Sequence, residues 1–265
     1  MSSFIKKQER KKMTTGIPLI DHILGEINPG TMIMIKEDEF SFIHNTLLNT
    51  FISEGARNNE KDLLVVSENE SNIAVYEEKK NTEKNNDVKK MFIAWRYSSL
   101  NLEVPDFKFS LNRKIDYIGK KTIGISTENI LNDIKNIKNH RIAIYSLFSP
   151  FYSDHIENVL FELRKSIRTN NHICMISIPT FLYENISFET FFDIVLKLNS
   201  NLMTGLLPNY RATIEFEKCA SYKSLRCLDL ESYIFGLKFK KDRLVVENID
   251  IPPDEEDPQR DCSAF

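Results

Sequence analysis

Residues 28–55 read NPG-TMIMI-KEDEFS-FIHNTLLNTFISEG, and this stretch decides how the chain folds. Asn28–Pro29–Gly30 predicts a turn, because proline fixes φ and glycine accepts a positive φ. The apolar run Thr31–Ile35 predicts a buried strand, and apolar residues then recur at helical spacing from about Phe42 to Gly55. The stretch therefore predicts a turn, a strand, a loop and a helix in direct succession.

The same alternation of strands and helices continues to about Ser200. Apolar runs predict strands, and apolar stripes predict helices. The predicted strands are Leu63–Val66, Met91–Trp95, Arg141–Leu147 and Ile173–Ile178. The predicted helices are Thr14–Leu24, Asn72–Tyr76, Thr127–Ile137, Ile156–Ile167 and Phe188–Leu196, the last capped by Ser187. Asn101–Gly119 is predicted to be irregular.

After Ser200 the pattern changes to strands without helices, at Ala212–Glu217, Tyr233–Phe239 and Leu244–Ile249. Alternating strands and helices build a parallel sheet with helices on both faces, and a later run of strands extends one edge. The predicted fold class is α/β: a three-layer domain with a mostly parallel central sheet and a C-terminal antiparallel extension.

The domain organisation follows from length and charge. A chain of 265 residues, 42% of them hydrophobic, forms one large domain or two small ones, and we assign a single domain to residues 14–253. Residues 1–13 form a basic arm and residues 254–265 an acidic tail, both expected to be disordered. Nine of the fourteen residues in 77–90 are charged, so this segment is expected to be a flexible insertion.

Composition excludes several classes of protein. A formal net charge of −3 argues against a domain that coats nucleic acid through bulk charge. The four cysteines have no zinc-ligand spacing, so no metal site is predicted. The sequence shows no signal peptide and no apolar run that could span a bilayer, which indicates the cytoplasm, with the nucleus as a second compartment. The basic arm is either a nuclear-localisation patch or a solvated tail.

The loop after the first strand carries the chemical argument. In a RecA-like nucleotide-binding core this loop supplies glycines whose N–H groups hold phosphates, then a lysine and a Ser or Thr. Here the degenerate phosphate-loop position holds no glycine and three consecutive acidic residues, which repel a triphosphate. Its candidate residues are Lys36, Glu37, Asp38, His44, Asn45 and Thr46. Lys36 stands at the wrong end of the loop, and Thr46 is either a retained hydroxyl or an ordinary helix residue.

A second nucleotide-handling element is also missing from the sequence. The strand Arg141–Leu147 should end in a carboxylate that binds metal or water, but Ser146 stands at that position. The histidines are dispersed, and neither a G-x-S-x-G nor an H-E-x-x-H pattern occurs. Two separate losses predict a domain without catalytic residues.

Several short segments in a fixed order resemble the PAXNEB family, the family of the fourth Elongator subunit. The segments are Thr15–Gly25, the glycine-free loop with Glu37–Asp38, Ile93–Tyr97, Arg141–Ile142 running into Ser146–Pro150, Ser177–Thr180 and Val246–Pro253. The turn before the first strand, Gly25–Gly30, is less glycine-rich than in that family. The short loops, rich in Asn and Lys, suggest a compact, divergent member.

The resemblance implies a role that composition does not. Members have a RecA-like fold without intact phosphate-binding motifs, and they join two related RecA-like subunits in a hetero-hexameric ring. The ring is an accessory part of Elongator, which modifies the wobble uridine of tRNA, while the chemistry lies in another subunit. The ring binds tRNA and is linked to nucleotide-dependent tRNA release. The resemblance thus implies no cofactor for this chain alone, a nucleotide at a shared interface as an option, and no membrane.

Candidate contacts follow from position. Aromatic residues after core strands lie at the ligand-facing edge of an open α/β sheet, where they line a ring pore or subunit contact, or else form core under a loop. These candidates are Phe148, Phe151, Tyr152, Phe181 and Tyr183. Arg96, Arg211 and Lys218 are candidate tRNA contacts or solvated charges. Two other functions stay open: an ATPase with an unorthodox phosphate loop, for example in DNA repair, and a scaffold unrelated to tRNA.

Overall fold

The computed structural model describes residues 13–24, 27–58, 60, 63–67, 69–79, 108–116, 120–123, 127–135, 141–149, 155–183, 186–200, 210–220 and 233–249. Its helices are α1 (Pro18–Leu24), α2 (Ile43–Arg57), α3 (Thr127–Lys135) and α4 (Ile156–Asn170), with 3-10 turns η1 (Glu70–Asn72), η3 (Thr180–Leu182) and η4 (Phe188–Phe191). Its strands are β1 (Met32–Lys36), β2 (Leu63–Ser67), β3 (Val75–Glu78), β4 (Phe109–Ile115), β5 (Lys120–Ile123), β6 (Arg141–Ile144), β7 (Ile173–Ile178), β8 (Ile194–Asn199), β9 (Ala212–Cys219), β10 (Ile234–Lys240) and β11 (Arg243–Asn248).

Within the described residues, nine strands form one sheet in the order β11-β10-β9-β8-β1-β7-β6-β2-β5. Every neighbouring pair from β8 to β5 is parallel, and β9, β10 and β11 continue the sheet in antiparallel pairs. Strands β3 and β4 form a separate antiparallel pair. The predicted parallel sheet with an antiparallel C-terminal extension is confirmed.

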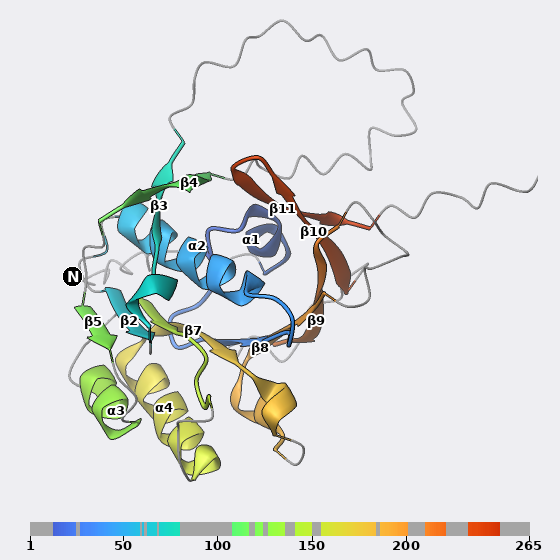
Figure 1. Ribbon diagram of the computed structural model, residues 1–265. Helices are drawn as coiled ribbons and strands as arrows, with labels where there is room; N and C mark the ends of the chain where they lie inside the picture. Colours follow the sequence, from blue (N-terminus) through green and yellow to red (C-terminus); the bar gives the residue numbers. More distant parts are fainter. Residues whose placement is uncertain are drawn as a thin grey trace, which may run out of the picture.

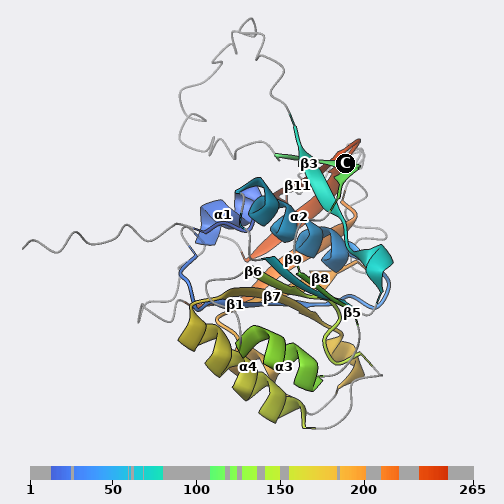
Figure 2. The same cartoon turned by 90° about the vertical axis from the view of Figure 1, so that its left-hand side faces the viewer.

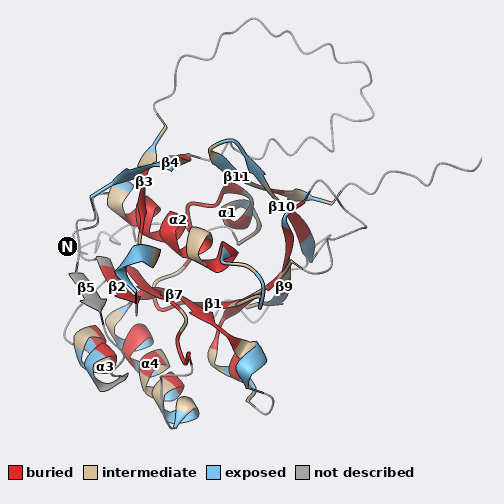
Figure 3. Ribbon diagram, viewed as in Figure 1, coloured by how far each residue is buried: buried red, intermediate tan, exposed pale blue. Residues whose placement is uncertain are grey.

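The sheet is the middle of three layers (Figure 2). Helices α1 and α2 lie on one face, and α3 and α4 lie on the other (Figures 1 and 2). Side chains alternate along each strand, so β1 supplies Ile33 and Ile35 to the core under α2 and Met32 and Met34 to the core over α4. The central strands are buried, while the outer faces of α3 and α4 are partly exposed (Figure 3).

The predicted helix Phe188–Leu196 is wrong, because the chain forms a short 3-10 turn there and then strand β8. The aromatic spacing imitates a helix, but Val195 faces the core over α4 whereas Leu196 faces the core under α2. Opposite faces for successive residues are a strand property. Pairing of β8 with β1 and β9 therefore decides the structure here.

Other differences lie near the ends of elements. The predicted helix Asn72–Tyr76 is wrong, because β3 begins at Val75, and part of the irregular segment Asn101–Gly119 is strand β4. The first helix begins at Pro18, since proline suits the first helical position. Ser146 and Leu147 follow β6 without belonging to it.

The structure describes few of the residues that were predicted to form the arm, the insertion and the tail. The flexible insertion expected at 77–90 is wrong for its first three residues, because Glu77 and Glu78 belong to β3 and Lys79 pairs with Asp242 at 3.0 Å. Most of that insertion, residues 1–12 of the basic arm, the acidic tail and the strand Met91–Trp95 lie outside the described residues. Met13, which was predicted to belong to the disordered arm, is instead buried and bridged to Ile27. In the part of the chain that the structure describes, no helix is both long and apolar enough to cross a bilayer.

Candidate functional site

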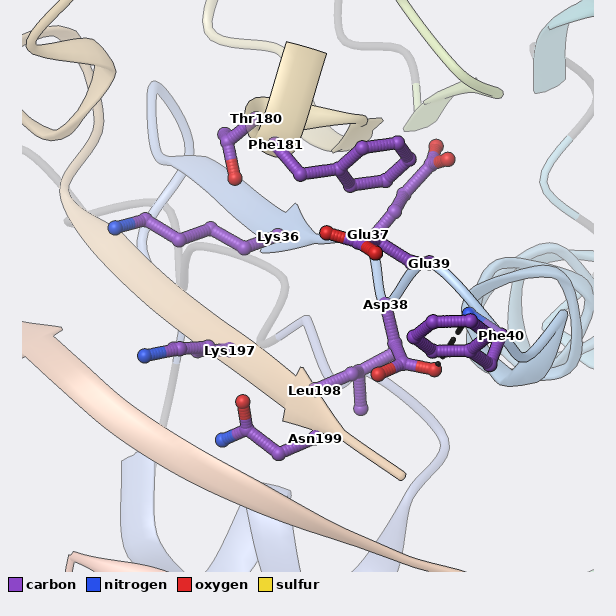
Figure 4. Close-up of a pocket in the computed structure, with 10 residues that line it drawn as sticks. All are labelled: Lys36, Glu37, Asp38, Glu39, Phe40, Thr180, Phe181, Lys197, Leu198 and Asn199. Atoms are coloured by element: carbon purple, nitrogen blue, oxygen red, sulfur yellow. Dashed lines mark hydrogen bonds between the residues drawn. The ribbon is translucent and has the colours of Figure 1, made fainter. Parts of the chain in front are cut away.

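A cavity of about 410 Å³ opens at the carboxyl ends of β1, β7 and β8. Its lining comes from the end of β1 and the following loop, from the turn after β7 and from the end of β8 (Figure 4). The lining residues are Lys36, Glu37, Asp38, Glu39, Phe40, Thr180, Phe181, Lys197, Leu198 and Asn199. Parallel strands end at the same edge of the sheet, and this edge is the ligand-facing one in open α/β folds.

Asp38 fastens the loop to the end of β8. The Ser200 amide donates to Asp38 Oδ1 at 3.1 Å, the Ser200 hydroxyl donates to Oδ2, and the Phe40 amide donates to Oδ2 at 3.0 Å. Burial raises the pKa of Asp38, but the hydrogen bonds from Ser200 and Phe40 outweigh it, so the pKa is lowered. The loop therefore folds around an ionised carboxylate of its own. A phosphate-binding loop instead folds around the phosphate of a bound ligand.

Glu37 and His44 form a buried pair beneath this loop. Glu37 Oε2 lies 3.8 Å from His44 Nε2, and the exposed fractions of the two side chains are only 7% and 5%. Burial lowers the pKa of His44, although the charges of Glu37 and Asp38 raise it. The imidazole is therefore neutral at pH 7, and it gives the Glu37 carboxylate no compensating charge.

Buried polar atoms without hydrogen-bond partners cluster at the same place. Among the described residues these atoms include Glu37 Oε1, His44 Nδ1 and Asn45 Oδ1. Leaving such an atom unpaired costs about 1–3 kcal/mol. Helix α2 begins beside them after Phe42 with no side-chain cap. The region carries unused hydrogen-bonding capacity, which is typical of a place that binds something.

Lys36 is engaged elsewhere. Its Nζ contacts Glu189 and lies 2.5 Å from Glu217 Oε2, and Lys197 lies 3.7 Å from the other oxygen of Glu217. Burial lowers the pKa of Lys36, but Glu189 and Glu217 raise it by more. The pKa is therefore above its ordinary value, and the ammonium group stays charged. Alternation along β1 places Lys36 on the face of Met34, away from α2. The positive charge of Lys36 is therefore already compensated by two carboxylates and is not available to a phosphate.

Exposed apolar side chains occur in the cavity lining, at Phe40 and Phe181, and next to these residues in the sequence. Phe40 is 68% exposed and Phe42 is 79% exposed, and both flank the start of α2. Phe181 and Leu182, in the turn after β7, are also exposed. An apolar rim beside a charged cavity is unusual on a solvated surface and is typical of interaction sites.

Ser146 and Thr46, the proposed relics of metal binding, both have structural contacts. The Ser146 amide donates to Ser177 Oγ at 2.8 Å, and its backbone has a left-handed φ of 48°. Thr46 lies in the first turn of α2 with Asn45, and its carbonyl accepts a hydrogen bond from Thr50. Within the described residues no group of three or more His, Cys, Asp or Glu side chains gathers as metal ligands.

The aromatic candidates separate into two kinds. Phe148 is fully buried, its ring packs 6.3 Å from that of Phe188, and its carbonyl accepts a hydrogen bond from Tyr183. The surface role predicted for Phe148 is therefore wrong, and the alternative of core under a loop holds. Tyr183 packs edge-on against Phe188 and is partly buried, whereas Phe181 is exposed in the cavity lining. Phe151 and Tyr152 lie outside the described residues.

The basic candidates do not form one patch. Arg211 is exposed just before β9 begins, and Lys218 lies near the other end of that strand. Seven positions along a strand span about 24 Å. Lys218 Nζ donates to the Glu189 carbonyl at 2.8 Å. Arg96 lies outside the described residues.

Sequence reasoning missed Ser200, the partner of Asp38, and Glu189 and Glu217, the partners of Lys36. Asp38 and Ser200 are 162 positions apart in the chain, and Lys36 and Glu217 are farther apart still. Their recognition required strand β8, which the sequence pattern assigned to a helix. The only signal at Ser200 was its place in a short polar segment, Asn199–Ser200–Asn201, after an apolar run.

The strand order β8-β1-β7-β6-β2 with a loop between β1 and α2 at the ligand-facing edge defines a RecA-like domain. Solved structures agree with this class. A KaiC-like protein from Pyrococcus horikoshii superimposes with a TM-score of 0.54 at 14% identity, over 89% of this chain and 98% of that one. An ATPase domain gives a TM-score of 0.56 at 12% identity, over 92% and 94% of the two chains.

The chain belongs to the PAXNEB protein family, whose model matches residues 7–117 and 120–264. Curated relatives are Elongator complex protein 4 of Homo sapiens, 26% identical, and of Xenopus laevis, 23% identical. Each alignment covers 91% of this chain, and it covers 77% of the human and 80% of the frog protein. The predicted family and the RecA-like fold are confirmed.

Proposed function

We propose that this chain is a non-catalytic subunit of the Elongator complex. The relatives that it matches over 91% of its length are named Elongator complex protein 4. In this proposal it joins two related RecA-like subunits in a hetero-hexameric ring that also contacts the remaining Elongator subunits. The ring binds tRNA and supports modification of its wobble uridine, while another subunit carries out the chemistry.

The charge of the cavity is the observation that supports a non-catalytic role. Glu37, Asp38 and Glu39 lie where a phosphate-binding loop would present backbone N–H groups, and Lys36 is held by Glu189 and Glu217. Two like charges 4 Å apart repel by about 4 kcal/mol at the effective dielectric constant of a protein surface. A triphosphate would meet several such charges. The chain alone therefore binds no nucleotide in this proposal, and a shared ring interface is the place for one.

Purification of the tagged full-length chain from its own cells tests the assembly. Mass spectrometry should identify other Elongator proteins, including two further RecA-like chains, and the native mass should correspond to a hexameric ring. A chain that purifies as a monomer contradicts the proposal. Stable partners without any Elongator protein would favour the scaffold unrelated to tRNA. Fractionation should place the complex in the cytoplasm, with the nucleus as a second compartment.

The tRNA role is tested by salt. If Arg96, Arg211 and Lys218 contact phosphates, tRNA affinity of the assembled ring falls steeply as salt rises, since each contact releases counterions. Arg211→Ala should reduce that slope, because Arg211 is exposed and its side chain is available for contact. Affinity that does not change with salt argues against backbone contacts by any of the three residues.

One alternative function is an ATPase with an unorthodox phosphate loop, for example in DNA repair, and the ATPase domain at a TM-score of 0.56 shares the fold that such a function would use. That function needs tight nucleotide binding and turnover by the isolated chain. The carboxylates of the loop argue against it, and a magnesium-ATP assay separates the two functions.

A further inference from the structure

The cavity after β1 is divided into a basic side and an acidic side. The ammonium groups of Lys36 and Lys197 point to one side, whereas Glu37, Asp38 and Glu39 occupy the other (Figure 4). The two lysines pair with Glu189 and Glu217. Their charge is therefore already compensated, and the acidic side determines what the cavity attracts.

The acidic side keeps negative charge that no described cation compensates. Among the described residues the groups that donate to Asp38 are neutral, and they belong to Ser200, Phe40 and Ser41. Within the described residues Glu37 has only the neutral His44 near its carboxylate, and its Oε1 is buried without a donor. Glu39 is exposed and takes part in none of the ion pairs between described residues. A buried carboxylate oxygen that lacks a donor indicates a ligand that brings one.

Aromatic rings stand on the same side. The rings of Phe40 and Phe181 flank the three carboxylates, on the side away from the lysine ammonium groups (Figure 4). Aromatic faces attract cations, most strongly where water is partly excluded. Carboxylates and aromatic rings together are suited to a planar organic cation, and a cavity of about 410 Å³ has room for one with its side chain.

We propose that this cavity is a docking site for an arginine side chain of a protein partner. A guanidinium group offers five N–H donors in a fixed fork, which suits carboxylates, and its flat face stacks on phenylalanine rings. The ring of Phe42, two residues after Phe40, is also exposed, and aromatic and arginine side chains are enriched among the residues that dominate binding at protein interfaces. A nucleic acid would bring phosphates to the same carboxylates and be repelled. This inference concerns the ligand of the cavity and holds whichever complex supplies the partner.

A peptide titration of the full chain tests the charge requirement. The probe is acetyl-Leu-Arg-Leu-amide, and its control is the same peptide with citrulline, which has the shape of arginine without the charge. The arginine peptide should shift the backbone amide resonances of residues 37–40 and 181–182 and bind at least about tenfold more tightly, because charge-assisted hydrogen bonds are lost with citrulline. Equal binding of the two peptides, or shifts confined to other residues, overturns the proposal.

Variants of the lining separate docking from folding. Glu39→Gln and Phe40→Ser change exposed residues and should each weaken the arginine peptide about threefold or more. Glu37→Gln removes the buried charge and should weaken it further. The matched controls, Glu157→Gln and Phe161→Ser, lie at exposed positions of α4 and should leave affinity unchanged. If neither Glu39→Gln nor Phe40→Ser reduces affinity while both variants fold, the cavity is not the arginine site.

A photo-crosslinking amino acid at Phe40 tests the site in the assembled complex. It should join a partner peptide that contains arginine, and replacing that arginine by glutamine should abolish the cross-link. The same amino acid at Phe161 is the control. Cross-links to RNA alone, or none from Phe40 in an intact complex, overturn the proposal. Absence of Elongator proteins from the purified complex would contradict the proposed function. A cross-link from Phe40 to an arginine-containing peptide of another partner would still support the docking site.

Discussion

The two ends of helix α2 hold buried charges in opposite ways. At its C-terminal end, Glu54 accepts hydrogen bonds from Thr14 and Arg57, and Lys108 lies 3.8 Å away. Beside it Arg141 pairs with Glu60 at 2.9 Å. At its N-terminal end, buried atoms of Glu37 and His44 lack partners among the described residues. Fully paired charges stabilise a fold, whereas unpaired ones weaken it and leave groups free for binding, so we assign architecture to the first end and docking to the second.

Removing Arg141 should produce the largest effect. Arg141 is buried, donates to the carbonyls of Thr14 and Phe51 at 2.7 and 3.2 Å, and lies 4.4 Å from the centre of the Phe51 ring. Arg141→Met removes the ion pair with Glu60 and the guanidinium hydrogen bonds to two carbonyls, which should lower the free energy of unfolding by about 3–5 kcal/mol.

Urea unfolding measures that loss, and Arg113→Met is the matched control. Arg113 lies 3.6 Å from Glu77, but its side chain is 74% exposed, and such pairs contribute about 0–1 kcal/mol. Equal losses for the two variants would contradict the architectural role of the paired end.

Gly16→Ala should have the next largest effect. Gly16 has a φ of +85°, and an added Cβ would lie 2.9 Å from Glu54 Cβ and 3.1 Å from the Thr50 carbonyl oxygen. Strained backbone and overpacking should together cost about 2–3 kcal/mol, again measured by urea unfolding. A cost below about 0.5 kcal/mol would show that α2 and the segment before α1, which contains Gly16, do not pack as closely as described.

A pH titration distinguishes the two ends directly. Burial lowers the pKa of His44 below 6.5, so the unfolded chain binds more protons at this residue as the pH falls. The folded state therefore keeps its full stability above pH 6.5 and loses stability as the pH falls below that value. Burial raises the pKa of Glu54, but Arg57, Lys108 and Thr14 lower it more, so its contribution persists until pH falls below 4.5. The N-terminal end should therefore weaken first on acidification.

His44→Gln isolates that effect. The variant should flatten the rise of unfolding free energy with pH just below 6.5, where a single site changes it by at most about 1.4 kcal/mol per pH unit. The control His22→Gln makes the same substitution at an exposed position of α1. An unaltered profile in His44→Gln would argue against a buried neutral imidazole at the docking end.

The smallest effects on stability belong to the cavity rim. Glu39→Gln and Phe40→Ser alter exposed side chains, so each should change the free energy of unfolding by less than about 0.5 kcal/mol. The same two variants should weaken the arginine peptide. A large loss of stability with either would mean that the rim is part of the architecture.

The sequence predicted residues 28–57 well because the signals there are local. The turn Asn28–Pro29–Gly30, the apolar strand and the amphipathic helix after it all appear as expected. Residues 188–196 misled the prediction because the aromatic spacing fits a helix, and only pairing with β1 and β9 makes Ile194–Asn199 a strand. Strand β4 depends in the same way on its partner β3.

The site was predictable in composition but not in contacts. The absence of glycine and the three acidic residues in 37–39 could be read directly. The partners of Asp38 and Lys36 come from β8, η4 and β9, far along the chain, and the buried state of Glu37 and His44 depends on how those elements pack. Long-range packing leaves no periodic signal in a single sequence.

Magnesium-ATP binding and turnover by the purified full-length chain test the central claim most directly. The account predicts that ATP binding and ATP hydrolysis both stay at the level of a matched blank. Carboxylates occupy the phosphate position, and the charge of Lys36 is compensated by Glu189 and Glu217. Tight, magnesium-dependent binding with steady ATP hydrolysis by this chain alone would contradict it.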